Sequence, residues 1–137
     1  MSNLYAFLHP ELPEQKEVVF SRFKDENGNV VPFVIRPITS EVNKALIKKC
    51  TLTTKDRSGV NRKIDTDRYQ AEIVLAGTVQ PDFSDAQICE AYGVVSPELV
   101  IGKMLLAGEF MTLVNEILAL SGLDEESEEA AVAEAKN

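Results

Sequence analysis

The sequence is poor in the residues that most often carry enzyme chemistry. It contains a single histidine, His9, two cysteines and no tryptophan. Acid–base and nucleophilic catalysis usually need a group that titrates near neutral pH, or a nucleophile held beside a base. His9 stands next to Pro10 near the start of the chain, so a catalytic triad or a Cys–His pair would have to recruit a residue from that end. We therefore predict that the protein is not an enzyme and has no catalytic residues.

Motifs for metals, redox chemistry and phosphates are also missing. Cys50 and Cys89 have no CxxC spacing and no neighbouring histidine, which argues against a zinc site or a redox pair and favours buried thiols. No GxxxxGK or GxGxxG pattern offers a phosphate cradle. Two carboxylate pairs occur, Asp65 with Asp67 and Asp82 with Asp85. We interpret them as helix-capping residues rather than as acid–base or metal-binding pairs. We expect no cofactor and no bound metal.

Long apolar runs are absent. No stretch approaches the roughly 18 apolar residues that cross a bilayer. The N-terminus also lacks the basic start of a signal peptide. These absences predict a protein of the reducing cytoplasm that has no membrane partner.

Positive charge is scarcer than negative charge, since 14 Lys and Arg stand against 22 Asp and Glu for a formal net charge of −8. In the last fourteen residues six acids oppose Lys136, a balance of −5, which leaves −3 for residues 1–123. Nucleic-acid phosphates require clustered cations, so we expect no nucleic-acid partner. One small cluster exists in residues 52–63 (LTTKDRSGVNRK), which we interpret as a flexible, solvated loop because no aromatic residues interleave for stacking.

What the sequence does contain is a succession of helix signals. Capping residues, apolar spacing and glycine stops predict five helices, over about 39–51, 65–77, 85–93, from 97 onward, and 108–122. Ser84 is the predicted N-cap of the third helix, with Gln87 completing a capping box and Phe83 facing Ile88 as a hydrophobic staple. Glu109 follows Gly108 at the start of the last helix, where a carboxylate stabilises the free amides, so we interpret it as structural.

Residues 18–36 (VVFSRFKDENGNVVPFVIR) predict a β-hairpin. β-branched and aromatic residues flank Asn27 and Gly28, both of which tolerate the positive φ of a tight hairpin turn. Pro32 cannot donate a ladder hydrogen bond, so its strand is expected at an edge. A two-stranded pair is marginal alone and must lie against helices or gain strands from elsewhere.

Together these signals predict an α+β fold that is mainly helical, with an N-terminal β-hairpin followed by a bundle of about five short helices. We expect one globular domain over residues 1–123, made of an arm (1–16), the hairpin (18–36) and a helical core (39–122). Residues 124–137 are expected to form a disordered acidic tail. The arm carries an apolar patch formed by Leu4, Tyr5, Phe7 and Leu8. We favour an arm that folds on the core, and a free docking peptide remains the alternative.

The order of several short segments goes further than composition. PDF before a capped helix, then AYG, SPELV and LLAGEFMTLVNEILALSG, resembles the XkdN-like tail assembly chaperones of contractile-tailed phages and of prophages in Gram-positive bacteria. That family has a strand pair, a polar helix, a PDF-type segment, a YG helix end and a Gly–Glu pair opening the last helix. The matching positions here, which also have packing or capping explanations, are Pro81, Asp82, Phe83, Tyr92, Gly93, Gly108, Glu109, Leu113, Ile117 and Gly122.

The resemblance implies a non-enzymatic chaperone that binds the tape measure protein and keeps it soluble during tail tube assembly, with the tail tube protein as a second candidate partner. A homo-oligomer is left open. The main alternative is a structural virion component, such as a neck or tail completion subunit, that uses the hairpin edge for ring assembly. A regulatory adaptor that binds host proteins through the acidic tail is a third reading.

Overall fold

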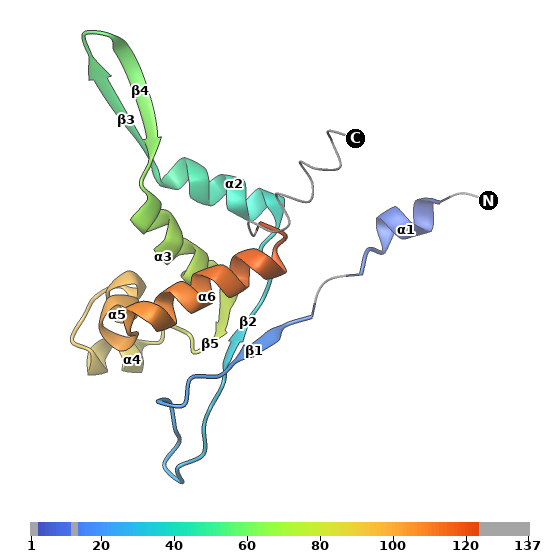
Figure 1. Ribbon diagram of the computed structural model, residues 1–137, viewed down its shortest axis with the longest axis vertical. Helices are drawn as coiled ribbons and strands as arrows, with labels where there is room; N and C mark the ends of the chain where they lie inside the picture. The colour runs from blue at the N-terminus through green and yellow to red at the C-terminus, as the bar shows by residue number, and fades with distance from the viewer. Residues whose placement is uncertain (1–2, 12–13, 124–137) are drawn as a thin grey trace.

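The computed structural model describes residues 3–11 and 14–123 (Figure 1). The α+β class is confirmed, and every helix predicted between residues 39 and 122 is present. The predicted disorder of residues 124–137 lies outside the described residues. In chain order the elements are α1 (Leu4–Leu8), β1 (Lys16–Val18), β2 (Phe33–Ile35), α2 (Ser40–Lys49), β3 (Thr51–Asp56), β4 (Gly59–Ile64), α3 (Thr66–Gly77), β5 (Thr78–Gln80), α4 (Ala86–Ala91), α5 (Pro97–Met104) and α6 (Ala107–Leu120).

An antiparallel sheet with the strand order β1–β2–β5 joins distant parts of the chain. Val18 of β1 pairs with Phe33 of β2, and Ile35 of β2 pairs with Thr78 of β5. On the helix side, Lys16 of β1 forms an ion pair with Glu116 of α6. The third strand supplies the support that a two-stranded pair lacks in water.

The predicted N-terminal hairpin over residues 18–36 is wrong. β1 and β2 do pair, but residues 19–32 between them form a loop, called the aromatic loop below. The expected tight turn is present, because Gly28 has a φ of 84°. Only an isolated bridge between Lys24 and Val30 stands beside that turn, so no continuous ladder runs from the turn to the sheet.

The aromatic loop leaves strand geometry because its aromatic side chains pack against the sheet. The rings of Phe20 and Phe23 both meet the buried Phe33 ring edge-on, with centroids 5.2 and 4.8 Å away. Such edge-to-face pairs add to the gain from apolar burial. The guanidinium of Arg22 lies 4.6 Å from the Phe23 ring centroid and stacks over it. These contacts override the local preference for two extended strands.

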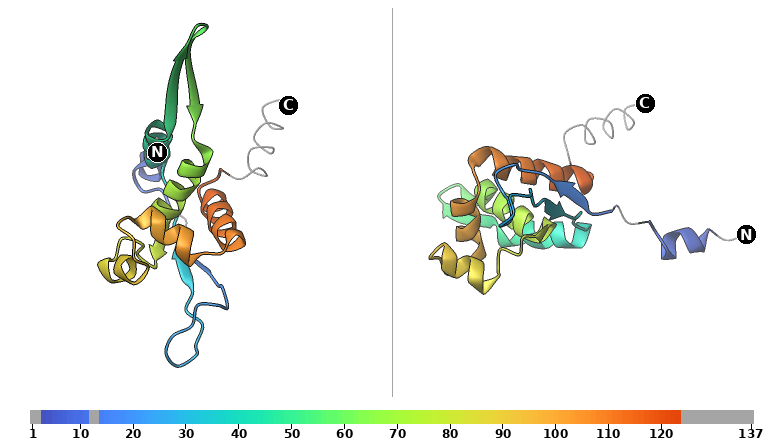
Figure 2. Two further views of the ribbon diagram at one scale, coloured as in Figure 1. Left: turned by 90° about the vertical axis from the view of Figure 1, so that its left-hand side faces the viewer. Right: turned by 90° about the horizontal axis from the view of Figure 1, so that it is seen from below.

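A β-hairpin does occur in the fold, where the sequence predicted a flexible loop. β3 and β4 pair in register from Thr51 opposite Ile64 to Asp56 opposite Gly59. They form a two-stranded ribbon (residues 51–64) that projects at the end of the molecule opposite the aromatic loop (Figures 1 and 2). The Asp56 carboxylate closes its turn by accepting hydrogen bonds from the Ser58 amide and hydroxyl. Every position of both strands except Thr51 is exposed.

The hydrophobic core lies between the three-stranded sheet and helices α3, α5 and α6. Gly77 at the end of α3 permits close helix packing, because a Cβ there would stand 2.5 Å from Cγ2 of Ile117 on α6. Side chains from all of these elements meet in one buried cluster: Val18, Phe33, Ile35, Ile73, Val74, Phe83, Val100, Ile101, Leu105, Leu113, Val114 and Ile117.

Glycine stops two helices as predicted. Gly93 after α4 and Gly122 after α6 have φ values of 67° and 75°. After α6 the Gly122 amide donates to the Ala119 carbonyl and the Leu123 amide to the Leu118 carbonyl. Two such bonds define a Schellman motif, which satisfies carbonyls that the helix leaves open.

The capping box predicted at Ser84 is wrong by one residue. Asp85 is the N-cap of α4, and its carboxylate accepts the Gln87 amide at 2.8 Å. Ser84 instead donates from its amide and hydroxyl to Asp82 in the preceding turn. A carboxylate accepts backbone amides at a helix start as readily as a hydroxyl does, so the aspartate one position on takes the role.

The N-terminal helix α1 does not have the buried patch that a folded arm requires. Leu4, Tyr5, Phe7 and Leu8 are between 58% and 80% exposed. In Figures 1 and 2 α1 lies to one side of the sheet and the larger helices. The described part of the arm therefore resembles the docking-peptide alternative more than the folded one.

Candidate functional site

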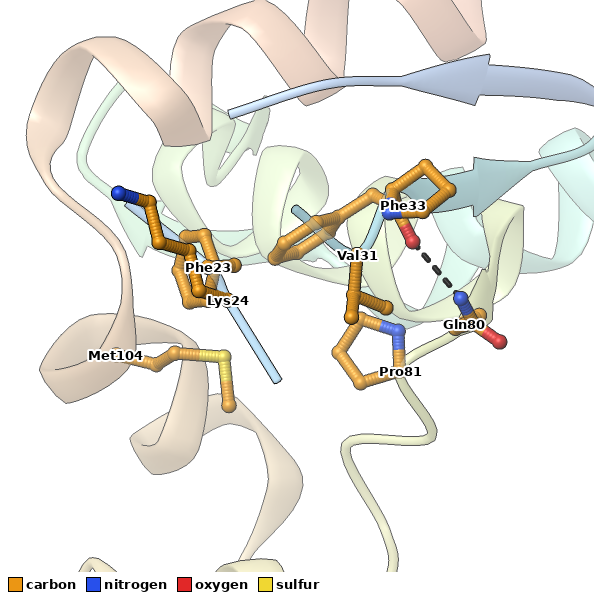
Figure 3. Close-up of a pocket in the computed structure, with 8 residues that line it drawn as sticks. Phe23, Lys24, Val31, Phe33, Gln80, Pro81 and Met104 are labelled. Atoms are coloured by element: carbon orange, nitrogen blue, oxygen red, sulfur yellow. Dashed lines mark hydrogen bonds between the residues drawn. The ribbon is translucent and has the colours of Figure 1, made fainter. Parts of the chain in front are cut away.

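A small apolar pocket opens where the aromatic loop, the end of β5 and the end of α5 meet (Figure 3). We call it the anchor pocket; its volume is about 240 Å³. Small-molecule sites usually span roughly 300–1,000 Å³, so a pocket of this size suits an apolar side chain of a partner better than a cofactor. Its lining residues are mostly apolar or aromatic: Phe23, Lys24, Val31, Pro32, Phe33, Gln80, Pro81 and Met104.

The two walls of the anchor pocket come from segments far apart in the sequence. In Figure 3, Phe23 and Met104 lie on one side and Val31 and Pro81 on the other. The Gln80 side-chain amide donates to the Pro32 carbonyl at 2.8 Å and ties the end of β5 to the aromatic loop. The peptide bond between Gln80 and Pro81 is cis. The pocket is therefore a product of tertiary structure.

An ion pair holds the aromatic loop against the α5–α6 junction. Arg22 donates from Nε and Nη2 to the two carboxylate oxygens of Glu109, and its Nη2 also donates to the Met104 carbonyl at 2.8 Å. The hydrogen bond from Arg22 lowers the pKa of the Glu109 carboxyl, with help from the Leu106 amide. The same contact raises the pKa of Arg22. This pair fixes the loop beside Met104, which forms one wall of the anchor pocket.

Glu109 has the structural role that the sequence predicts. Its carboxylate accepts the Leu106 amide at 2.8 Å at the start of α6. Sequence reasoning missed Arg22, because the two residues stand 87 positions apart and no local pattern links them. A bidentate arginine–carboxylate pair is also geometrically specific, so it orients the loop as well as attaching it.

Four of the ten family-motif residues belong to the core. Phe83, Leu113 and Ile117 are buried, and Tyr92 packs partly buried against them. Gly93 and Gly122 end helices, as described above.

The other motif residues lie at turns and helix starts. Asp82 is exposed, and the hydrogen bond from the Ser84 hydroxyl lowers its carboxyl pKa. A Cβ at Gly108, in the first turn of α6, would meet nothing within 4 Å. Of the ten residues only Pro81 lines the anchor pocket. The motif therefore marks the fold more than it marks a site.

The residues that the sequence singled out for chemistry are dispersed. His9 is exposed, and its ring stacks on Tyr5 with centroids 4.3 Å apart. Cys50 is buried, which raises its thiol pKa, and Cys89 is half-buried. Asp65 caps α3 by accepting the Arg68 amide, as predicted. Within residues 3–11 and 14–123, no three His, Cys, Asp or Glu side chains are grouped as metal ligands, and no helix is long and apolar enough to cross a membrane.

A larger hollow of about 460 Å³ lies at the other end of the sheet. Gln15, Arg36, Thr39 and Ser121 give it a more polar lining than the anchor pocket has. The Ile38 amide donates to Ser121 Oγ across it at 2.9 Å, so the hollow is the seam where α6 meets the start of α2. We therefore take the anchor pocket as the candidate site for a partner.

The fold and the anchor pocket define a small α+β protein with an apolar surface pocket. The chain belongs to the phage XkdN-like tail assembly chaperone family, whose profile matches residues 4–136. It is 35% identical over 130 residues to the phage-like element PBSX protein XkdN of Bacillus subtilis (strain 168), which covers 93% of this chain and 86% of that protein.

A second relative connects the chain to an experimental structure. The uncharacterized protein YqbN of the same Bacillus subtilis strain is 37% identical over 141 residues, covering 98% of this chain and 93% of YqbN. The crystal structure of the protein YqbN superposes with a TM-score of 0.71 and 28% sequence identity over 90% of this chain and 99% of that one. The overall fold described above is therefore similar to one seen by crystallography.

Proposed function

We propose that the protein is a tail assembly chaperone that binds the tape measure protein of its phage or prophage and keeps it soluble until the tail tube assembles around it. Family membership supports the general role. The observation that carries the specific role is the anchor pocket, an apolar hollow whose lining includes Val31, a side chain that is 36% exposed. We place the work in the host cytoplasm, where tails assemble.

The chemistry of the anchor pocket fits an amphipathic helix. A long chain with apolar helical stripes aggregates unless those stripes are covered. Helix-in-groove recognition covers them by seating apolar side chains spaced one turn apart in hollows of the partner. The pocket offers aromatic, proline and methionine contacts with one cation, Lys24, at its rim. Methionine adapts to side chains of different shape, which suits a chaperone that must bind many similar stripes.

The small size of the pocket also suits release. A few deeply buried anchors supply most of the affinity of a protein interface. With one pocket each, single chaperone molecules would bind weakly, and several would coat a long client together. Tube subunits could then displace them one at a time. The alternative of a ring-forming virion component relied on the edge of a hairpin over residues 18–36, and the three-residue strand β1 is the edge present there instead.

The test is coexpression of the full chain with the tape measure protein of the same phage or prophage. We expect the chain to raise the soluble yield of the tape measure protein. Val31→Glu places a charge at the pocket rim and should abolish the gain, because an unpaired charge is costly to bury. Val95→Glu makes the same change at a residue that is 96% exposed and does not line the pocket, so it should retain the gain.

Two outcomes would overturn the proposal. Equal insolubility of the tape measure protein with and without the chain would remove the chaperone role. Equal loss of yield with Val31→Glu and Val95→Glu would remove the anchor pocket from it. Circular dichroism of both variants checks that each is folded. Recovery of the chain in purified mature particles would instead favour the structural role.

A further inference from the structure

The ribbon and the helix before it carry a local excess of positive charge in an acidic protein. Residues 40–68, which hold α2, the ribbon and the start of α3, have eight Lys and Arg against four Asp and Glu, a balance of +4. Residues 69–123 have one Lys against seven acids, a balance of −6. The charges are therefore segregated between two parts of the chain, and such segregation is typical of electrostatically matched surfaces.

The cations of the ribbon have no internal partner. Among the residues that the structure describes, the ion pairs within 4 Å join Lys16, Arg22 and Lys49 to acids, and none involves a ribbon cation. The single acid of the ribbon, Asp56, already accepts hydrogen bonds from Ser58 and Asn61 in the turn. An acidic partner would neutralise these cations without breaking an existing contact.

One face of the ribbon combines positive charge with apolar surface. The pairing of Thr51 with Ile64 and of Lys55 with Val60 fixes which side chains share a face, since residues two apart on a strand point the same way. That face carries no acid, and its members are Thr51, Thr53, Lys55, Val60, Arg62 and Ile64. Val60 and Ile64 are 55% and 41% exposed. A matching partner would therefore combine acids with small apolar residues.

The chain contains such a segment, and it starts close by. Residues 124–137 (DEESEEAAVAEAKN) hold six acids, five alanines or valines and one lysine. They follow Leu123 directly after α6, and α6 is tied to the start of α2 by the bond from the Ile38 amide to Ser121 Oγ. The ten residues of α2 span about 15 Å to the base of the ribbon. Fourteen residues reach up to roughly 46–50 Å when extended, so the segment is long enough to lie along α2 and the ribbon.

We propose that α2 and the ribbon form a docking surface for the chain's own acidic segment, residues 124–137. The segment neutralises Lys55 and Arg62 and covers the apolar side chains of Val60 and Ile64 on the same face. A two-stranded ribbon leaves two open strand edges that invite pairing with another chain. By lying on one face of the ribbon, the docked segment hinders the approach of another chain to those edges. The surface is a poor match for nucleic acid, because residues 51–64 contain no aromatic side chain for base stacking and the whole chain carries −8.

The test places a nitroxide spin label at Ser127→Cys in the full-length chain and records amide peak intensities by NMR. Cys89 is replaced by serine to leave one reactive thiol, because Cys50 is fully buried. We expect a loss of intensity for ribbon amides between Lys55 and Lys63 and unchanged intensities in the aromatic loop at the far end. At 1 M salt, where the Debye length is about 3 Å, the lost ribbon intensity should return.

A matched variant keeps the full chain and removes only the charge. Glu125→Gln, Glu126→Gln, Glu128→Gln and Glu129→Gln together should abolish the loss of ribbon intensity while chemical shifts outside residues 40–64 stay unchanged. A second sample mixes ¹⁵N chain that carries no spin label with spin-labelled chain at natural isotope abundance. Its ribbon amides should show no loss of intensity. Undiminished ribbon intensity in the spin-labelled chain would overturn the proposal, and so would a loss that persists in 1 M salt or in the four-glutamine variant. A loss in the mixed sample would also overturn it, because the segment would then bind a second copy of the chain.

Discussion

The two β-structures of this protein differ in what holds them together. The β1–β2–β5 sheet has three-residue strands, yet Val18, Phe33 and Ile35 are buried beneath helices. The ribbon has six-residue strands and a complete register, yet it is exposed along almost its whole length. The sheet therefore depends on apolar burial and the ribbon on local pairing. Strand length is a poor guide to which of them stabilises the fold.

The sharpest test of this difference compares two isoleucines in strands. Ile35→Ala in β2 removes a side chain that is 0% exposed and should cost about 2–5 kcal/mol of unfolding free energy through lost burial and the cavity left behind. Ile64→Ala in β4 removes one that is 41% exposed and should change stability by no more than about 0.5 kcal/mol. Urea unfolding of both variants measures the two values. Similar losses would mean that the ribbon is part of the cooperative core.

This contrast also explains which parts of the fold the sequence predicts. Helix boundaries follow from local signals, such as the cap at Asp65 and the glycine stop at Gly93. The turn at Gly28 was likewise predicted correctly. β1 and β2 pair beyond this turn, but the continuous ladder expected between them and the turn does not form, because Phe20 and Phe23 pack against Phe33 and draw the chain away.

The ribbon sequence contains residues that favour strands, but its polar composition suggests a loop. Residues 51–64 are polar and contain Gly59, which suggested a loop, but threonine, valine and isoleucine recur through them and favour strands. The anchor pocket had no such signal. Its walls join residues 50 or more positions apart, and Arg22 and Glu109 stand 87 positions apart, so only the folded chain brings them together.

The next test concerns the packing on which the buried sheet relies. Gly77→Ala should cost about 1–3 kcal/mol, because the added Cβ would overlap Ile117 and force α3 and α6 apart. Gly102→Ala is the control, since a Cβ there meets nothing within 4 Å and alanine favours helix by about 0.5–1 kcal/mol. Thermal or urea unfolding compares them. A neutral Gly77→Ala would show that the helix interface can adjust.

A smaller effect is expected where the aromatic loop attaches to the body. Glu109→Gln should cost about 1 kcal/mol, below the 1.5–3 kcal/mol usual for bonds to charged groups because Arg22 is partly exposed. The Glu109 pKa is lowered in the folded state, so its contribution is present above the ordinary carboxyl value and disappears as pH falls through the folded pKa.

Unfolding of the native chain and of Glu109→Gln at several pH values measures this effect. The stability difference should be full at neutral pH and should shrink as the pH drops below about 4.3, the ordinary pKa of glutamic acid. A difference that stays constant down to strongly acidic pH would assign the loss to side-chain packing rather than to the ion pair.

Hydrogen exchange of the free chain and of its complex with the tape measure protein tests the central claim that the anchor pocket, and not the ribbon, receives the client. In the free chain, sheet amides should exchange only through global unfolding, while ribbon amides open locally. On binding, we predict slower exchange in residues 19–32 and 78–83 with unchanged exchange in residues 51–64. Protection confined to residues 51–64, with the aromatic loop unchanged, would contradict the account.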